Sequence, residues 1–269
     1  MMNPLCSINP GPGISSKADV QLFEVWSTET DEFKCSRFTH FDSTDHVWIG
    51  QKDDVRKYEL TVSDLNSALT VVPDEKAFPR VPEHVTPAAT TDPITCFVKR
   101  PQVHALLNEN YAPYVPQMLM DEVETLEFLI DYPHPNIVLY HSCKIERGYL
   151  TGIVLQRQPK ILDHRFLDDV TAFDVCAFES QLQAAVGHVH GLGFAHNDLN
   201  PSNIALNERD EPIIIDWGSS KKFGEQLLSA GTPEWIDEEF DVSKKEHDIS
   251  ALHKIVAWVK EKKERQTQK

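Results

Sequence analysis

The sequence has no apolar run long enough to cross a membrane. Its first residues, MMNPLCSINPGPGISS, lack the basic start and the apolar stretch of a signal peptide. Positive charge is also scarce, since 26 Lys and Arg face 42 Asp and Glu, for a net charge of −16. Surfaces that bind nucleic acid or anionic membranes need an excess of Lys and Arg. We therefore expect neither a nucleic acid nor a membrane as partner.

Cysteine is sparse, and its spacing excludes two further classes of protein. The five cysteines have neither paired spacing nor neighbouring histidine clusters: Cys6, Cys35, Cys96, Cys143 and Cys176. This pattern argues against a disulfide framework and against a zinc site. We expect reduced thiols in a protein of the cytoplasm or the nucleus.

Glycine is absent between Gly50 and Gly148. Loops that wrap their backbone closely around phosphate groups depend on glycine. The sequence therefore predicts no glycine-rich phosphate loop in this stretch.

What is present is a succession of short strands followed mostly by helices. Residues 1 to about 20 are rich in Pro, Gly and Ser, which predicts disorder. Apolar patterning predicts strands over 21–26, 46–50, 57–62 and 94–100, and two strands within 136–156 around an Arg147-Gly148 turn. Helical periodicity predicts helices after Pro116, over 178–192 and over 247–263.

This order predicts an α+β fold with two lobes. We expect an N-terminal extension over residues 1–45, partly disordered, an N-terminal lobe over 46–155, and a mainly helical C-terminal lobe over 156–269 that is shortened.

The chemistry is concentrated in two short motifs. GFAHNDLNPSNIAL (193–206) holds His196, Asp198 and Asn203, and IIIDWG (213–218) brings Asp216. Phosphoryl transfer from a nucleotide needs Mg²⁺ on hard oxygen ligands, a cation on the phosphates, and an acid that orients the attacking hydroxyl. The residue types fit, with Asp198 facing the acceptor and with Asn203 and Asp216 as the metal ligands.

These motifs resemble those of the protein kinase superfamily, over about residues 94–260. HNDLNPSN is similar to the H-x-D-x-x-x-x-N catalytic loop, and DWG is similar to the metal-binding D-F-G turn. FVKR resembles the strand with the phosphate-pairing lysine, which would be Lys99. DEVETLEFL resembles the helix whose glutamate pairs with it; the alignment selects Glu122 and leaves Glu124 as the alternative. The wording of the motifs is closest to that of fungal kinase-like proteins.

The resemblance extends to the substrate side of a serine/threonine kinase. GTPEWIDEEF is similar to the loop G-T-P-x-Y-x-A-P-E, which assigns its threonine to Thr232. HDISAL resembles the buried helix in which Asp248 would brace the catalytic loop. In the family, the histidine that corresponds to His196 packs near the D-F-G turn, so a structural role is expected for His196.

The sequence also departs from the family pattern. Phe97 stands two residues before Lys99, where the family keeps an alanine against the adenine ring, and its bulk would narrow that part of the nucleotide site. Asn197 replaces the arginine that receives a phosphorylated loop, and Asn200 replaces the catalytic-loop lysine.

Three functions therefore compete. The first is an ATP- and Mg²⁺-dependent protein serine/threonine kinase, and we favour it because the base and both metal ligands are kept. The second is a small-molecule phosphotransferase of the aminoglycoside or choline kinase type, which Asn200 favours. The third is a pseudokinase that binds partners without chemistry, which Phe97 and the missing glycines favour. The sequence does not identify the protein or small-molecule hydroxyl that would accept the phosphate.

Overall fold

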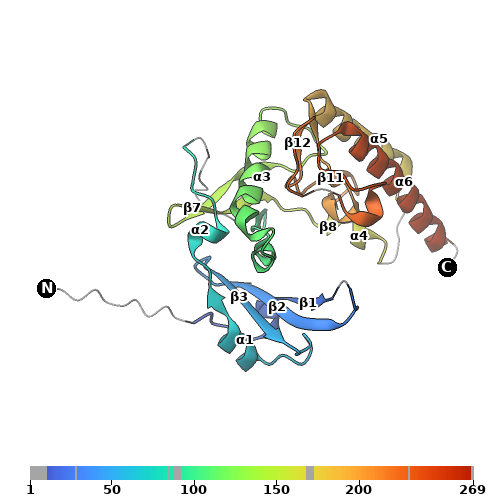
Figure 1. Cartoon of the computed structure of the whole chain (residues 1–269). Coiled ribbons are helices and arrows are strands. Elements are labelled where there is room, and N and C mark those ends of the chain that lie inside the picture. Colours follow the sequence, from blue (N-terminus) through green and yellow to red (C-terminus); the bar gives the residue numbers. More distant parts are fainter. Residues whose placement is uncertain are drawn as a thin grey trace. The chain divides into compact units, whose positions relative to one another are not determined.

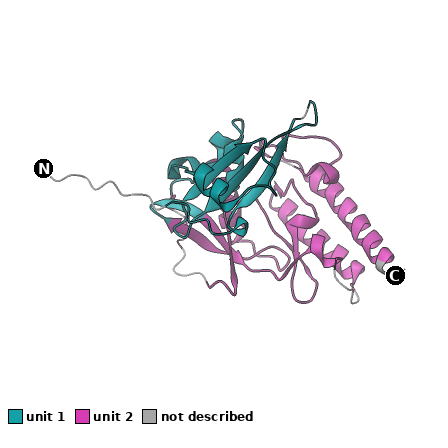
Figure 2. Ribbon diagram, turned by 90° about the horizontal axis from the view of Figure 1, so that it is seen from below, with its two compact units in different colours: residues 1–80, 101–116, 146–151 teal, residues 81–100, 117–145, 152–269 magenta. Residues whose placement is uncertain are grey.

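The computed structural model describes residues 11–27, 29–83, 85, 87, 92–167, 173–229 and 231–267 (Figure 1). The chain divides into two compact units. Unit 1 comprises residues 1–80, 101–116 and 146–151, and unit 2 comprises residues 81–100, 117–145 and 152–269 (Figure 2). No helix in the described ranges is long and apolar enough to span a membrane.

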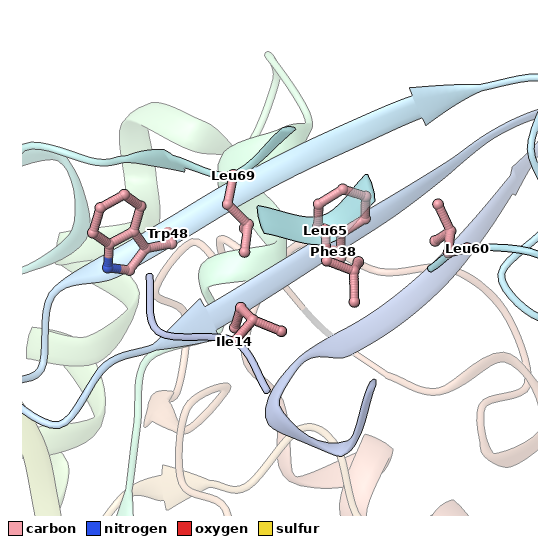
Figure 3. Close-up of a cluster of buried hydrophobic side chains, with 6 residues drawn as sticks. All are labelled: Ile14, Phe38, Trp48, Leu60, Leu65 and Leu69. Atoms are coloured by element: carbon pink, nitrogen blue, oxygen red, sulfur yellow. The ribbon is translucent and has the colours of Figure 1, made fainter. Parts of the chain in front are cut away.

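Unit 1 is built on an antiparallel sheet with the strand order β1-β2-β3-β4. Its strands are β1 (Gln21–Trp26), β2 (Phe33–Phe41), β3 (Val47–Asp53) and β4 (Thr70–Val71), and its helices are α1 (Val62–Ala68) and α2 (Asp74–Ala77). One face of the sheet forms a core around Phe38, with Ile14, Trp48, Leu60, Leu65 and Leu69 (Figure 3). Gly50 lies opposite Phe38, and a Cβ at residue 50 would come within 2.3 Å of the Phe38 ring. Glycine is therefore required there for the packing of Phe38.

Residues 57–62 do not form the predicted strand, and this prediction was wrong. Residues 57–61 form a turn and loop, and Val62 begins helix α1. Thr61 caps this helix, because its hydroxyl accepts a hydrogen bond from the Asp64 backbone N–H while the Asp64 carboxylate accepts one from the Thr61 N–H. This capping box starts a helix, and it overrides the strand-like alternation of the apolar residues.

The beginning of the chain also differs from the prediction. Residues 1–10 of the segment predicted to be disordered lie outside the described residues. Ile14, by contrast, is 6% exposed within the core, and Ser16 caps a short 3-10 helix over Lys17–Asp19. The boundary expected at residue 45 falls between β2 and β3, which pair over residues 35–41 and 47–53. Residues 21–41 therefore belong to the sheet rather than to an extension.

Unit 2 begins with a three-stranded sheet of order β5-β7-β6. Its elements are β5 (Cys96–Lys99), α3 (Val115–Leu129), β6 (Tyr140–Glu146) and β7 (Tyr149–Gln156), of which α3, β6 and β7 each have end residues counted in unit 1. The predicted β6–β7 hairpin is confirmed. Its two turn residues, Arg147 and Gly148, have φ values of 52° and 79°, as a two-residue hairpin turn requires.

The rest of unit 2 contains helices and short strands: β8 (Lys160–Ile161), α4 (Leu162–Arg165), α5 (Val175–Gly191), β9 (Phe194–Ala195), β10 (Ile204–Leu206), β11 (Pro212–Ile214), β12 (Lys221–Lys222) and α6 (Lys245–Thr267). Helices α5 and α6 contact each other through their apolar faces (Figure 1). Helical spacing would place Ile249 on the apolar face of α6 with Leu252, but Ile249 is 41% exposed, and Ala251 is buried beside Leu252 instead.

Two strand pairs position the functional motifs. Strands β10 and β11 form a hairpin with Ile204 opposite Ile214, so the residues at its open end, Asn203 and Ile215, are neighbours; the Ile215 N–H donates to the Asn203 carbonyl at 3.0 Å. Strand β9, which precedes His196, pairs with β12. The HNDLNPSN motif is therefore held beside the DWG motif from both of its ends.

Candidate active site

Lys99, Glu122 and Asp216 form one cluster of charges. The Lys99 Nζ lies 2.7 Å from both carboxylate oxygens of Glu122 and 2.7 Å from Oδ1 of Asp216. The partner of Lys99 is therefore Glu122. Glu124, the alternative left open by the sequence, lies on the exposed face of α3.

Burial and charge have opposing effects on the three groups. Burial alone lowers the pKa of Lys99, but attraction to Glu122 and Asp216 outweighs burial and raises it, so the ammonium stays charged. Burial raises the pKa of Glu122 against the opposing effect of Lys99. Burial acts in the same sense on Asp216, yet Lys99 holds the pKa of this carboxyl below its usual value. Asp216 is thus the more strongly acidic of the two carboxyl groups.

The backbone at Asp216 has an unusual conformation. Its φ is 60°, a left-handed value that Asp tolerates better than most non-glycine residues. The next residue, Trp217, donates its backbone N–H to the Glu122 carboxylate at 3.1 Å, and its side chain is buried. Helix α3 and the DWG turn therefore contact each other through Glu122.

Asp198 lies at the centre of a second cluster. Its carboxylate accepts a hydrogen bond from the Thr232 hydroxyl at 2.8 Å and one from the Asn203 amide at 3.0 Å. The Asn200 amide also donates to this carboxylate, at 3.3 Å, and to the Thr232 hydroxyl, at 3.1 Å. The carboxylate is thereby held in one orientation and already receives an aliphatic hydroxyl.

His196 and Asp248 lie beneath this second cluster. The Asp248 carboxylate accepts hydrogen bonds from the backbone N–H groups of His196 and Asn197, both at 2.8 Å, and contacts His190 Nε2 at 2.8 Å. His196 Nδ1 accepts from the Asp198 N–H, so Nε2 carries the proton and donates to the Ile215 carbonyl at 3.0 Å. The His196 ring also packs edge-on against Trp217. His196 thus joins the HNDLNPSN motif to the DWG motif.

Asn203 and Asp216 offer oxygen donors of the kind that a magnesium ion prefers. Asn203 donates its amide N–H to Asp198, and its Oδ1 accepts no hydrogen bond from any described residue, which leaves an oxygen free to bind a cation. Asp216 adds an ionised carboxylate. No group of three His, Cys, Asp or Glu side chains in the described ranges could hold a metal alone. An amide oxygen and a carboxylate suit Mg²⁺, which proteins bind through one or two side chains together with nucleotide phosphates.

Phe97 is not part of either cluster. It lies on β5 two residues before Lys99, so the two side chains are on the same face of the sheet, and Phe97 is 46% exposed. The Arg157 guanidinium lies 5.9 Å from its ring centre. A half-exposed aromatic ring therefore stands beside the lysine.

Sequence reasoning did not anticipate the roles of two asparagines. In the sequence, Asn197 and Asn200 stand out as departures from the kinase pattern; in the structure both side chains are buried. The Asn197 amide donates to the carbonyls of Ala195 and Ser219 and to the Ser243 hydroxyl, at 3.0 to 3.1 Å. The Asn200 side-chain oxygen accepts hydrogen bonds from the backbone N–H groups of Ser202 and Asn203. The available signal was the run of short polar side chains in HNDLNPSN, which favours local turns.

Comparison with known proteins adds independent information. The family model described as protein kinase domain matches residues 103–251, more than half of the chain. The match includes Glu122, Asp198 and Asp216 but begins after Lys99.

Individual kinases are similar over shorter stretches. A probable myosin light chain kinase of Dictyostelium discoideum is 30% identical over 137 residues, 45% of this chain and 40% of the relative. Human 3-phosphoinositide-dependent protein kinase 1 is 27% identical over 164 residues, 56% of this chain and 28% of the relative. Mouse ribosomal protein S6 kinase alpha-2 is 33% identical over 131 residues, which are 46% of this chain and 18% of the relative. The chain thus covers 40% or less of the length of each of these relatives.

The expected fold class, α+β and protein kinase-like, is confirmed by this match together with the strands and helices described above. The chain belongs to the protein kinase domain family.

Proposed function

We propose that the protein transfers the terminal phosphoryl group of ATP, with Mg²⁺, to the hydroxyl of a serine or threonine in a protein substrate. The proposal is supported by membership of the kinase family and by the residues assembled in unit 2. We place the protein in the cytoplasm or the nucleus and expect no nucleic-acid partner. Likeness to fungal kinase-like proteins also stays a prediction.

Each residue has a distinct role in this proposal. Lys99, oriented by Glu122, provides the positive charge for the phosphates. Asn203 and Asp216 hold Mg²⁺, which bridges phosphate oxygens and neutralises charge that develops on them. Asp198 orients the acceptor hydroxyl and takes up its proton. Phe97 faces the adenine, and Thr232 lies on the substrate side. His196 and Asp248 position the HNDLNPSN motif, residues 196–203, which we call the catalytic segment.

The observation that carries the proposal is the 2.8 Å hydrogen bond from the Thr232 hydroxyl to the Asp198 carboxylate. A base acts on a substrate hydroxyl from hydrogen-bond distance or through one water. Asp198 keeps an aliphatic hydroxyl at this distance, and Asn200 and Asn203 fix its carboxylate. This arrangement supports proton acceptance from a serine or threonine hydroxyl as the role of Asp198.

A second function, a partner-binding pseudokinase, is favoured by the absence of glycine between Gly50 and Gly148. Fewer backbone N–H groups would then approach the phosphates, and nucleotide affinity would be low.

The deciding experiment measures nucleotide binding and phosphoryl transfer separately. Thermal unfolding is followed with ATP and Mg²⁺, with ATP and a chelator, and with Mg²⁺ alone; we expect ATP to stabilise the protein only with the metal. Radiolabelled ATP is then offered with protein and metabolite substrates. Label on serine or threonine of a protein supports the proposal, and label on metabolites alone favours the small-molecule phosphotransferase. Stabilisation without any transfer supports the pseudokinase.

A further inference from the structure

An ion pair joins helix α3 to the segment that follows the DWG turn; its Asp121 carboxylate is buried, and its Lys221 side chain is 22% exposed. Asp121 is 6% exposed, and its Oδ2 lies 2.7 Å from the Nζ of Lys221. Its Oδ1 accepts a hydrogen bond from the Gln117 amide at 2.6 Å, one helical turn earlier. Both carboxylate oxygens therefore have partners, as a buried charge requires.

Asp121 immediately precedes Glu122 in α3. Successive residues of a helix project about 100° apart, so the direction of Asp121 determines where Glu122 points. Thr125, one turn further on, donates its hydroxyl to the Asp121 carbonyl at 3.0 Å and reaches the Ser220 carbonyl at 3.4 Å. The contact between α3 and residues 220–221 thus extends over two successive helical turns.

Lys221 is itself anchored to the catalytic segment. It lies in β12, opposite Ala195 in β9, the residue just before His196. The Ser220 hydroxyl donates to the Ala195 carbonyl at 2.9 Å, and the Ser243 hydroxyl donates to the Lys221 carbonyl at 3.0 Å. A continuous series of contacts therefore runs from the catalytic segment through Lys221 to Asp121 and to its neighbour Glu122.

We infer that Lys221 is a positioning residue, which holds α3 through Asp121 in the orientation that places Glu122 against Lys99. Its effect on catalysis rests on the proposed function, whereas its effect on α3 does not. Removing one partner of a buried ion pair leaves the other charge uncompensated, which is far more costly than removing both. Loss of the Lys221 charge should therefore free α3 to turn Asp121 towards water, and Glu122 would leave Lys99 with it.

The test compares four variants with the wild type by amide hydrogen exchange of α3 in the full chain. Lys221→Met should speed exchange in α3 by about 10- to 100-fold, and Lys221→Arg, which keeps the charge, should stay near the wild type. Lys222→Met is the matched control, because Lys222 is the next residue of β12 and its side chain is exposed. The double variant Asp121→Leu/Lys221→Met removes both charges and should restore slow exchange. Equal exchange in Lys221→Met and Lys222→Met would overturn the inference.

Kinetics separates positioning from general stability. Per folded molecule, Lys221→Met should lower kcat/KM by about 10-fold or more, and the double variant should recover activity. A role in stability alone would leave this value unchanged and overturn the inference. Should Lys221→Met fail to fold, Asp121→Asn, which removes the charge but keeps the shape, should give the faster exchange. If the wild type transfers no phosphate but exchange behaves as expected, the proposed function fails and the inference stands.

Discussion

Lys99 carries one positive charge between two carboxylates, so the buried cluster retains excess negative charge when Glu122 and Asp216 are both ionised. A divalent cation beside Asp216 would relieve this excess. The physical expectation is that nucleotide and Mg²⁺ bind together, because each supplies charge that the other lacks.

Two carboxylates of the site should respond differently to the same substitution. Asp198→Asn should leave the affinity for ATP and Mg²⁺ nearly intact and lower kcat by about 10² to 10⁴-fold, because Asp198 is assigned to the acceptor hydroxyl. Asp216→Asn should weaken nucleotide binding and abolish turnover together, because it takes a charged ligand from the metal. Titration calorimetry and initial rates measure both effects, with the exposed Asp163→Asn as control. Equal losses of nucleotide affinity in both variants would refute these assignments.

Phe97 offers a test of the nucleotide site. If its ring crowds the adenine, Phe97→Ala should tighten ATP binding by roughly 1 to 3 kcal/mol, the usual cost of one overpacked contact. Ile94→Ala is a suitable control, since Ile94 is 80% exposed just before the same strand. Unchanged or weaker affinity for ATP would show that Phe97 does not narrow the site.

At the scale of elements, the turn between β2 and β3 depends on one carboxylate. The Asp42 side chain accepts hydrogen bonds from the N–H groups of Thr44 and His46 and from the Trp48 indole. Burial alone would raise its pKa, but these bonds outweigh burial and lower the pKa to about 2. Because the folded-state pKa lies below the usual 3.8, the stabilisation is complete above about pH 4 and is lost as pH falls towards 2.

Asp42→Asn should therefore lower the free energy of unfolding of unit 1 by about 2 kcal/mol at pH 7, and the difference should shrink towards zero near pH 2. Asn keeps one acceptor oxygen but presents an N–H₂ group to the Trp48 indole. Urea unfolding followed by Trp fluorescence at several pH values checks this. A difference that does not depend on pH would exclude the carboxylate as its cause.

Helix α1 offers a second test at this scale. Thr61→Ala removes the hydroxyl half of the capping box and should lower the free energy of unfolding by about 1 kcal/mol. Ser67→Ala, at the other end of the same helix, should have a much smaller effect, since its exposed hydroxyl donates to the Asp64 carbonyl within the helix itself. Equal effects of the two substitutions in thermal unfolding would mean that the cap does not start the helix.

At the scale of the whole molecule, the loop after Asp216 is held by unmodified residues. Asn197 donates to the Ser219 carbonyl, and the Gly231 N–H donates to the Asn197 carbonyl at 3.1 Å. Kinases that need a phosphate on this loop bind it with an arginine, and Asn197 occupies that position. We predict that activity does not depend on phosphorylation of Ser219, Ser220 or Ser229. Phosphoryl transfer before and after phosphatase treatment measures this, and a large loss of activity would disprove it.

Much of the fold follows from local sequence. The helical period in α3 and α5 and the Arg147-Gly148 turn are local signals, because each depends on residues within a few positions of one another. The two motifs likewise indicated Asp198, Asn203 and Asp216, because phosphoryl transfer uses these residue types at these spacings. Strand β2 was not recovered, because long-range pairing with β3 decides it. Helix α1 was missed although its signal, the capping box of Thr61 and Asp64, is also local.

The sequence by itself determined which residues are candidates for the chemistry, since the types and the spacing of Asp198, Asn203 and Asp216 are written in the chain. Only the tertiary structure decided which acid of α3 meets Lys99, because that depends on the rotation of the helix. The tertiary structure also placed the buried Asn197 amide against the Ser219 carbonyl. It paired Asp121 with Lys221, which lies 100 residues further along the chain. The physical reason is that the energy of a charge or an amide depends on its burial and its partners, and these exist only once distant segments have packed together.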